Sequence, residues 1–187
     1  DSSAWRRLHS RIRAAAGTGA KLMVVNCCGG ARDEEPERVF DRAVSRLKVL
    51  AKTAADQGVT LAVETVRPDD SHVFNTLPEL VRLLDAVGED SVQASVDLTA
   101  AGMAGESLKD WFETLGKRLR HIRFVDGRPQ GRLAWGDGLR PLEDHVEWIN
   151  QYGYQGYLSL ALNDARYFDD PREADRKNMA ALAPFIQ

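Results

Sequence analysis

The sequence predicts an α/β fold with parallel strands. Short apolar runs rich in β-branched residues alternate with segments whose apolar positions have helical spacing, as expected for buried strands and their connecting helices. The runs start roughly 30–38 residues apart, close to the spacing of about 31 residues per unit of a (β/α)8 barrel. No Asn-Gly hairpin turn joins two of the runs, so we expect crossover connections between parallel strands.

The elements follow in order from these patterns. Five apolar runs are predicted as strands, at residues 21–26, 59–66, 91–97, 121–126 and 156–162. Six segments are predicted as helices, at residues 5–15, 36–57, 77–87, 108–115, 141–149 and 171–182. Gly17, Gly58 and Gly88 follow the first three helices, where glycine commonly ends a helix. Thr76 and Glu79 form a capping box at the start of the third helix, and proline opens the second, fifth and sixth helices.

The composition is that of an ordinary globular protein. The chain has 187 residues, of which 43% are hydrophobic and 28% are charged, so we expect a single domain over residues 1–187. The net charge is -3, whereas nucleic-acid-binding proteins are commonly basic. No apolar run reaches the roughly 18–20 residues that span a bilayer. We therefore expect neither nucleic acid nor membrane as a partner. The adjacent Cys27 and Cys28 give no disulfide framework, so we expect a cytoplasmic location.

Polar residues stand at the carboxyl ends of four predicted strands, where α/β proteins gather their reactive groups. They are Asn26, Glu64, Asp97, Arg123 and Asp126. Glu64 interrupts the apolar run LAVETV, where a buried carboxylate is costly unless it is paired or binds a metal. Glu64 is therefore a functional candidate, and a structural salt bridge is the alternative. Asp97 is either a site carboxylate or the N-cap of a short turn.

Several segments together resemble one known family. VTLAVETV, ASVDLTAAG, HIRFVD and WGDGLRPLEDHVEWINQYGYQGYLSL resemble the xylose isomerase-like TIM barrels, which include sugar isomerases, epimerases and dehydratases and are grouped with the endonuclease IV fold. The resemblance implies a partial (β/α)8 TIM barrel that covers roughly strands four to eight. Strands one to three are then absent from this chain. We expect that they were removed or are not represented, and the alternatives are a complementing chain or a homo-oligomer that completes the barrel.

The resemblance also implies a metal site, held in the family by Glu, Asp, His and Glu at strand ends. Glu64 matches the first ligand and Asp97 the second, but Arg123 stands at the third position and Ala161 at the fourth. We therefore expect no cofactor. The sequence leaves open a divalent metal (Mn, Mg, Zn or Co) held by the two remaining carboxylates. Our hypothesis is that Arg123 lies where the metal would be and pairs with Glu64 and Asp97. A pocket no longer used for chemistry is the alternative.

The resemblance implies an isomerase or epimerase that transfers a proton next to a carbonyl of a small sugar, polyol or related hydroxy-carbonyl compound. Glu64 is expected as base or acid, Asp97 as second carboxylate or substrate anchor, and Arg123 as the stabiliser of an enediolate. Asn26 and Asp126 are expected to contact substrate. Trp135 is expected either to cover a sugar face or to pack in the core. The alternatives are a non-catalytic homologue that binds a sugar or a protein, and a metal-assisted lyase or dehydratase.

Overall fold

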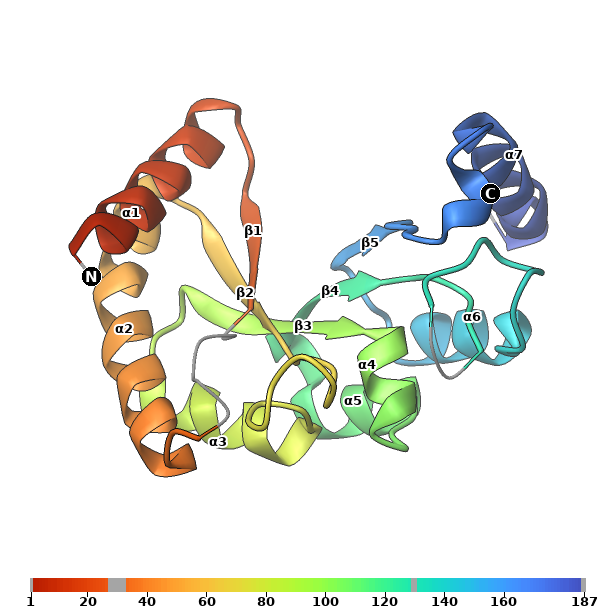
Figure 1. Ribbon diagram of the computed structural model, residues 1–187. Coiled ribbons are helices and arrows are strands. Elements are labelled where there is room, and N and C mark those ends of the chain that lie inside the picture. Colours follow the sequence, from red (N-terminus) through yellow and green to blue (C-terminus); the bar gives the residue numbers. More distant parts are fainter. Residues whose placement is uncertain (1, 27–32, 129–130, 186–187) are drawn as a thin grey trace. The chain divides into compact units, whose positions relative to one another are not determined.

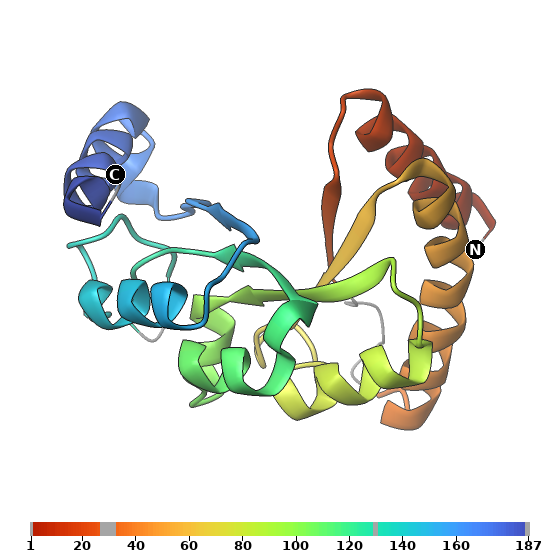
Figure 2. The ribbon, with the colours of Figure 1, turned by 180° about the vertical axis from the view of Figure 1, so that it is seen from behind.

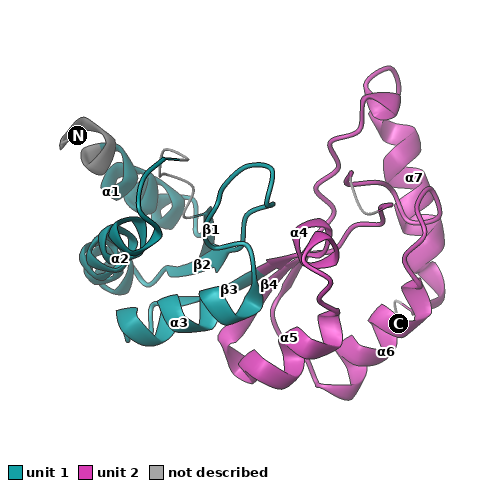
Figure 3. Ribbon diagram, turned by 60° about the horizontal axis from the view of Figure 1, so that its bottom comes forward, with its two compact units in different colours: residues 1–95 teal, residues 96–187 magenta. Residues whose placement is uncertain are grey.

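A computed structural model describes residues 2–26, 33–128 and 131–185 (Figure 1). Helices and strands alternate along it, which confirms the predicted α/β class. The chain forms two compact units, Asp1–Ser95 and Val96–Gln187 (Figure 3), and each is described here by itself. Within the described residues, no helix combines the length and the apolar character needed to cross a membrane. Cys27 and Cys28 lie outside the described residues.

The first unit is a parallel sheet with its helices. Its elements are α1 (Ser2–Gly17), β1 (Leu22–Asn26), α2 (Pro36–Gln57), β2 (Thr60–Glu64), α3 (Leu77–Val87) and most of β3 (Val92–Asp97). Strand β2 pairs in parallel with β1 and with β3. Asn26 is in register with Glu64, and Glu64 is in register with Ser95. The carboxyl ends of these strands therefore lie at the same edge of the sheet, as expected for parallel strands.

The helices of the first unit begin and end where the local signals predicted. Helix α2 has proline in its first turn and ends at Gly58, whose φ of 63° is left-handed. Thr76 and Glu79 form the predicted capping box of α3. Helices α1 and α2 lie side by side along β1 and β2 in both views (Figures 1 and 2), and α2 packs on α3. Their apolar faces and the strand interiors make a core that includes Leu47, Leu50, Leu61, Val63, Leu80 and Leu84.

The second unit contains two further parallel strands. Its elements are α4 (Leu98–Met103), α5 (Leu108–Leu115), β4 (Leu119–Arg123), α6 (Leu142–Gln151), β5 (Tyr157–Ser159) and α7 (Pro171–Leu182), with short 3-10 turns at Gly116–Arg118, Ala165–Tyr167 and Ala183–Phe185. Strand β4 pairs in parallel with β5. Helix α5 packs on α6 and on β4. The buried core of this unit is largely aromatic and aliphatic, with Trp111, Phe112, Ile122, Phe124, Val125 and Trp135.

Helix α4 and strands β4 and β5 of the second unit differ most from the prediction. Helix α4 was not predicted as a helix, and β4 runs over Leu119–Arg123 in place of 121–126. The chain leaves β4 early because Asp126 forms an antiparallel bridge with Leu133 in the following loop. Strand β5 is shorter than the predicted 156–162 because Asn163 turns to the same loop and donates its N–H to the carbonyl of Arg132, at 3.3 Å. Backbone groups that follow β4 and β5 thus form hydrogen bonds with this loop and not with a neighbouring strand.

Candidate functional site

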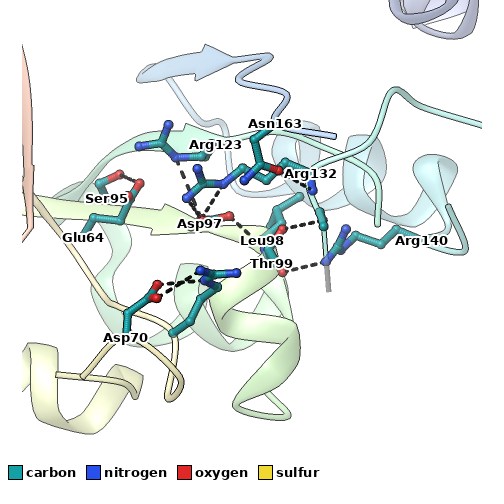
Figure 4. Close-up of polar contacts among 12 residues, drawn as sticks. Glu64, Asp70, Ser95, Asp97, Leu98, Thr99, Arg123, Arg132, Arg140 and Asn163 are labelled. Carbon is teal, nitrogen blue, oxygen red and sulfur yellow. Dashed lines mark hydrogen bonds and ion pairs between the residues drawn. The ribbon is translucent and has the colours of Figure 1, made fainter. Parts of the chain in front are cut away.

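At the strand ends of the first unit, a carboxylate is buried beside a hydroxyl. The Glu64 side chain lies at the end of β2, and the residue is 3% exposed. Ser95 Oγ, in register with it on β3, donates a hydrogen bond to Glu64 Oε1 at 3.2 Å (Figure 4). Asn26 is the register neighbour of Glu64 on β1 and is exposed. The structure therefore brings Asn26 next to Glu64, and the substrate contact expected of Asn26 stays a prediction. Ser95 is an addition that sequence reasoning missed, although it lies in the strand SVQASVD.

In the second unit, Asp97 ends β3 with both carboxylate oxygens engaged. Oδ1 accepts the backbone N–H of Thr99 at 2.9 Å, which makes Asp97 the N-cap of α4. Oδ2 accepts hydrogen bonds from Nε and Nη2 of Arg132, with Nε at 2.9 Å. The residue is 1% exposed. The N-cap interpretation of Asp97 is therefore confirmed for Oδ1, and its role as a site carboxylate stays a prediction.

Arg123 ends β4 and faces the same carboxylate. Its Nε lies 3.9 Å from Asp97 Oδ2, and its side chain is 20% exposed (Figure 4). This contact is one of the two ion pairs that the hypothesis for Arg123 requires. The other, with Glu64, stays a prediction, because Glu64 belongs to the first unit.

Arg132 is a functional candidate that sequence reasoning missed. It lies in the Gly/Pro-rich loop after β4, where no helical or strand periodicity marks its position. Its backbone is held from two sides: its N–H donates to Asn163 Oδ1 at 3.2 Å, and its carbonyl accepts from Asn163 N. Thr99 Oγ1 donates to the carbonyl of the preceding Gly131 at 3.0 Å. These bonds fix the loop so that the guanidinium reaches Asp97.

Asp126 organises the remainder of that loop. Its carboxylate accepts four backbone N–H groups: those of Gly127 and Arg140 on Oδ1, at 2.6 and 3.0 Å, and those of Gly136 and Gly138 on Oδ2, at 3.0 and 2.8 Å. The residue is 1% exposed. Its acceptor positions are therefore occupied by main chain, which gives Asp126 a loop-positioning role. The predicted substrate contact of Asp126 stays a prediction.

Trp135 lies in the aromatic core of the second unit. Its ring centroid is 4.6 Å from that of Phe124 and 5.8 Å from that of His145. Its backbone N–H donates to the buried Asn178 Oδ1 at 2.9 Å. Because the residue is 2% exposed, the geometry favours the packing alternative over a sugar contact.

Two further basic residues, the buried His121 and the partly buried Arg140, lie near this site. His121 lies two residues before Arg123 on β4. Burial and the charge of Arg123 lower the His121 pKa to about 4, although Asp97 opposes the shift. The imidazole is therefore neutral at neutral pH. Arg140 donates from its guanidinium to the carbonyls of Leu98 and Val125, at 3.2 and 3.4 Å, and so connects the start of α4 to the segment after β4.

The residues of the second unit do not fit a divalent metal. Both oxygens of Asp97 accept N–H groups, and two guanidinium groups stand on the side where a cation would bind. Ala161, at the fourth position implied by the resemblance, supplies no donor. In the described part of the chain, no group of three or more His, Cys, Asp or Glu side chains is arranged to hold a metal ion.

The chain belongs to the xylose isomerase-like TIM barrel family, which matches residues 1–185. Fructoselysine 3-epimerase of Escherichia coli O157:H7 is 28% identical over 139 residues, which cover 73% of this chain and 50% of that protein. The chain thus spans half the length of this curated relative.

Solved structures confirm the partial barrel. The 3-keto-D-glucoside 4-epimerase YcjR from E. coli superposes with a TM-score of 0.82 at 21% identity, over 96% of this chain and 70% of that chain. The IolI protein, solved with a bound zinc atom, superposes with a TM-score of 0.76 at 17% identity, over 97% of this chain and 70% of that chain. At these identities the likeness shows the fold alone.

Proposed function

We propose that this chain holds reacting residues of a sugar isomerase or epimerase that transfers a proton on a carbon next to a carbonyl. The observation that carries the proposal is the burial of Glu64, 3% exposed at the carboxyl end of an otherwise apolar parallel strand. This strand end is where parallel α/β folds gather their reacting groups. Membership of a family whose relatives include a 3-epimerase supports the same reaction type.

Glu64 is the proposed base. Its carboxylate takes the proton from the carbon next to the carbonyl, the C–H electron pair forms a C=C bond, and the carbonyl oxygen becomes negatively charged. The Arg123 guanidinium stabilises that oxygen. Return of the proton to the former carbonyl carbon, together with transfer of the hydroxyl proton of the first carbon to the negatively charged oxygen, gives isomerisation. Return to the opposite face of the first carbon gives epimerisation and requires a second acid.

Asp97 is the proposed anchor in this scheme. Because its Oδ2 accepts two hydrogen bonds from Arg132 and lies 3.9 Å from Arg123 Nε, Asp97 holds the two guanidinium groups in place. Asn26 is the proposed contact to substrate hydroxyl groups, since it is exposed beside Glu64. Asp126 acts by holding the loop after β4, and Trp135 acts by packing in the core of the second unit.

Solvent isotope incorporation tests the proposal. Purified protein is incubated in D2O with a panel of ketoses and aldoses, and NMR follows deuterium at the carbon next to the carbonyl. Glu64→Gln keeps the side-chain shape but cannot act as the base, so we expect a loss of about 10²–10⁴-fold in exchange and turnover. Glu147→Gln, on the exposed face of α6, is the matched control and retains the wild-type rate.

The remaining outcomes of the isotope experiment distinguish the alternative functions. Unchanged turnover in Glu64→Gln ends the proposal. Binding of sugars without any exchange identifies the non-catalytic alternative. A product that has lost one water molecule identifies the dehydratase alternative.

A further inference from the structure

A pocket of about 340 Å³ lies within the second unit, away from the strand ends described above. Leu119 and Arg120 are part of its lining and begin β4, whereas Arg123 ends that strand. The rest of the lining comes from α5 and the turn after it and from the turn between α6 and β5, and includes Phe112, Lys117, Tyr152 and Tyr154. Small-molecule sites commonly enclose roughly 300–1,000 Å³, so this pocket has the size for a ligand with one planar ring system.

One wall of the pocket is aromatic. The rings of Phe112 and Tyr152 are stacked, with centroids 5.2 Å apart and an interplanar angle of 15°. Tyr154 meets Phe112 edge to face, with centroids 5.6 Å apart. Phe112 is buried, whereas both tyrosines are half-buried and line the pocket. A planar ring in the pocket can therefore pack against an aromatic surface.

The turn that carries this wall is tightly held. Tyr154 Oη donates a hydrogen bond to the carbonyl of Tyr157 at 3.1 Å. A Cβ at Gly156 would lie 2.5 Å from the carbonyl oxygen of Arg120 and against the Tyr154 hydroxyl. The turn therefore passes directly over the start of β4, where glycine is required. A wall fixed in this way loses little freedom when a ligand binds, which favours affinity.

The pocket also presents two cations that no carboxylate compensates. Lys117 and Arg120 are exposed, and among the described residues neither side chain has an ion pair or a hydrogen bond. The described residues that line the pocket include no Asp or Glu. Glu113, beside the aromatic wall, accepts from Lys109 Nζ at 2.5 Å and from Tyr152 Oη at 3.0 Å, so its charge is already paired.

We infer that this pocket binds a small planar aromatic anion. Its ring packs on Tyr152, and its carboxylate or phosphate group is held by Lys117 and Arg120. The inference goes beyond the proposed function, because the pocket lies at the amino end of β4 and involves neither Glu64 nor Arg123. It holds or fails independently of proton transfer.

Calorimetry on the full chain tests the inference without measuring turnover. Indole-3-acetate and adenosine monophosphate each combine a planar ring system with an anion, a carboxylate in the first and a phosphate in the second. Indole-3-acetamide and adenosine lack the charge, and acetate and inorganic phosphate lack the ring. At low salt we expect at least one ring-bearing anion to bind about tenfold or more tightly than both of its counterparts. The anion that does so identifies carboxylate or phosphate as the charged group.

Substitutions assign the binding to this pocket. In the double variant Lys117→Gln with Arg120→Gln, we expect the preference over the uncharged counterpart to fall to about twofold or less. Lys48→Gln with Arg172→Gln is the matched control, because it removes two exposed cations outside the lining, and it keeps the preference.

A second pair of variants tests the ring contact. Tyr152→Leu keeps an apolar side chain but loses the aromatic face, so we expect binding to weaken about threefold or more. Tyr157→Leu, 55% exposed and outside the lining, is the control and binds as the wild type does. Circular dichroism checks that each variant is folded. The two cations are at exposed positions, so their double variant decides the matter if Tyr152→Leu does not fold.

Four results overturn the inference. They are absence of binding by both ring-bearing anions, equal binding of each anion and its uncharged counterpart, a preference that survives in the double variant, and acetate or phosphate that binds as tightly as the ring-bearing anion. Equal affinities in Tyr152→Leu and Tyr157→Leu would reject the ring contact.

Discussion

Arg132 donates from Nε and Nη2 to Oδ2 of Asp97, with Nε at 2.9 Å. The two residues are 35 positions apart in sequence. Together with the N–H of Thr99 on Oδ1, this ion pair explains how a carboxylate at the end of β3 is 1% exposed without an uncompensated charge.

Substitutions of Asp97 separate its two roles. Asp97→Asn keeps an oxygen for the cap of α4 but removes the charge that faces two guanidinium groups, so we expect the free energy of unfolding to fall by about 1–3 kcal/mol. Asp97→Ala also removes the cap, which adds about 1 kcal/mol. Urea denaturation measures both. Asp90→Asn, at an exposed position, is the control. Equal stabilities of the Asn and Ala variants would show that the cap contributes nothing.

Asp126 is expected to be the most sensitive position of the loop. Asp126→Asn replaces one acceptor oxygen by an NH2 group that faces backbone donors, so we expect a loss of about 3 kcal/mol in the free energy of unfolding. Asp144→Asn, exposed in the first turn of α6, should change stability by less than about 0.5 kcal/mol. Urea denaturation of both variants compares them, and equal effects would contradict the positioning role of Asp126.

The sequence predicted the helices and strands better than the candidate site. The ends of helices are determined by residues a few positions away, whereas the site depends on contacts between residues far apart in the sequence. Helix α2 has the predicted bounds, Pro36–Gln57, since its stop and start signals lie within a few residues of its ends. Arg132 has no such local signal, because its partners Asp97 and Asn163 come from distant segments. The six-residue α4 is too short to show a helical period.

His121 makes the stability of the second unit depend on pH. Its folded pKa of about 4 is below the unfolded value of about 6.5. The unfolded chain therefore binds more protons between these values, and stability falls as the pH drops through this window. Between pH 7 and pH 5 we expect a loss of about 2 kcal/mol from this group. His121→Gln lacks the titration, so urea denaturation should show a smaller pH dependence. An identical pH dependence in wild type and variant would show that His121 is not responsible.

Substitutions that introduce the metal ligands implied by the family resemblance are expected to give tight metal binding only if Arg132 is also removed. Arg123→His with Ala161→Glu restores the donor types that the family resemblance implies, yet Arg132 still donates to Asp97 Oδ2, and its charge repels a dication. Adding Arg132→Ala should therefore tighten Mn²⁺ binding about tenfold or more relative to the double variant. Calorimetry measures both, and Arg128→Ala in the double variant is the control. Equal affinities in the double and triple variants would show that Arg132 does not compete with the metal. Absence of binding in the triple variant would show that Arg123 and Ala161 do not occupy ligand positions.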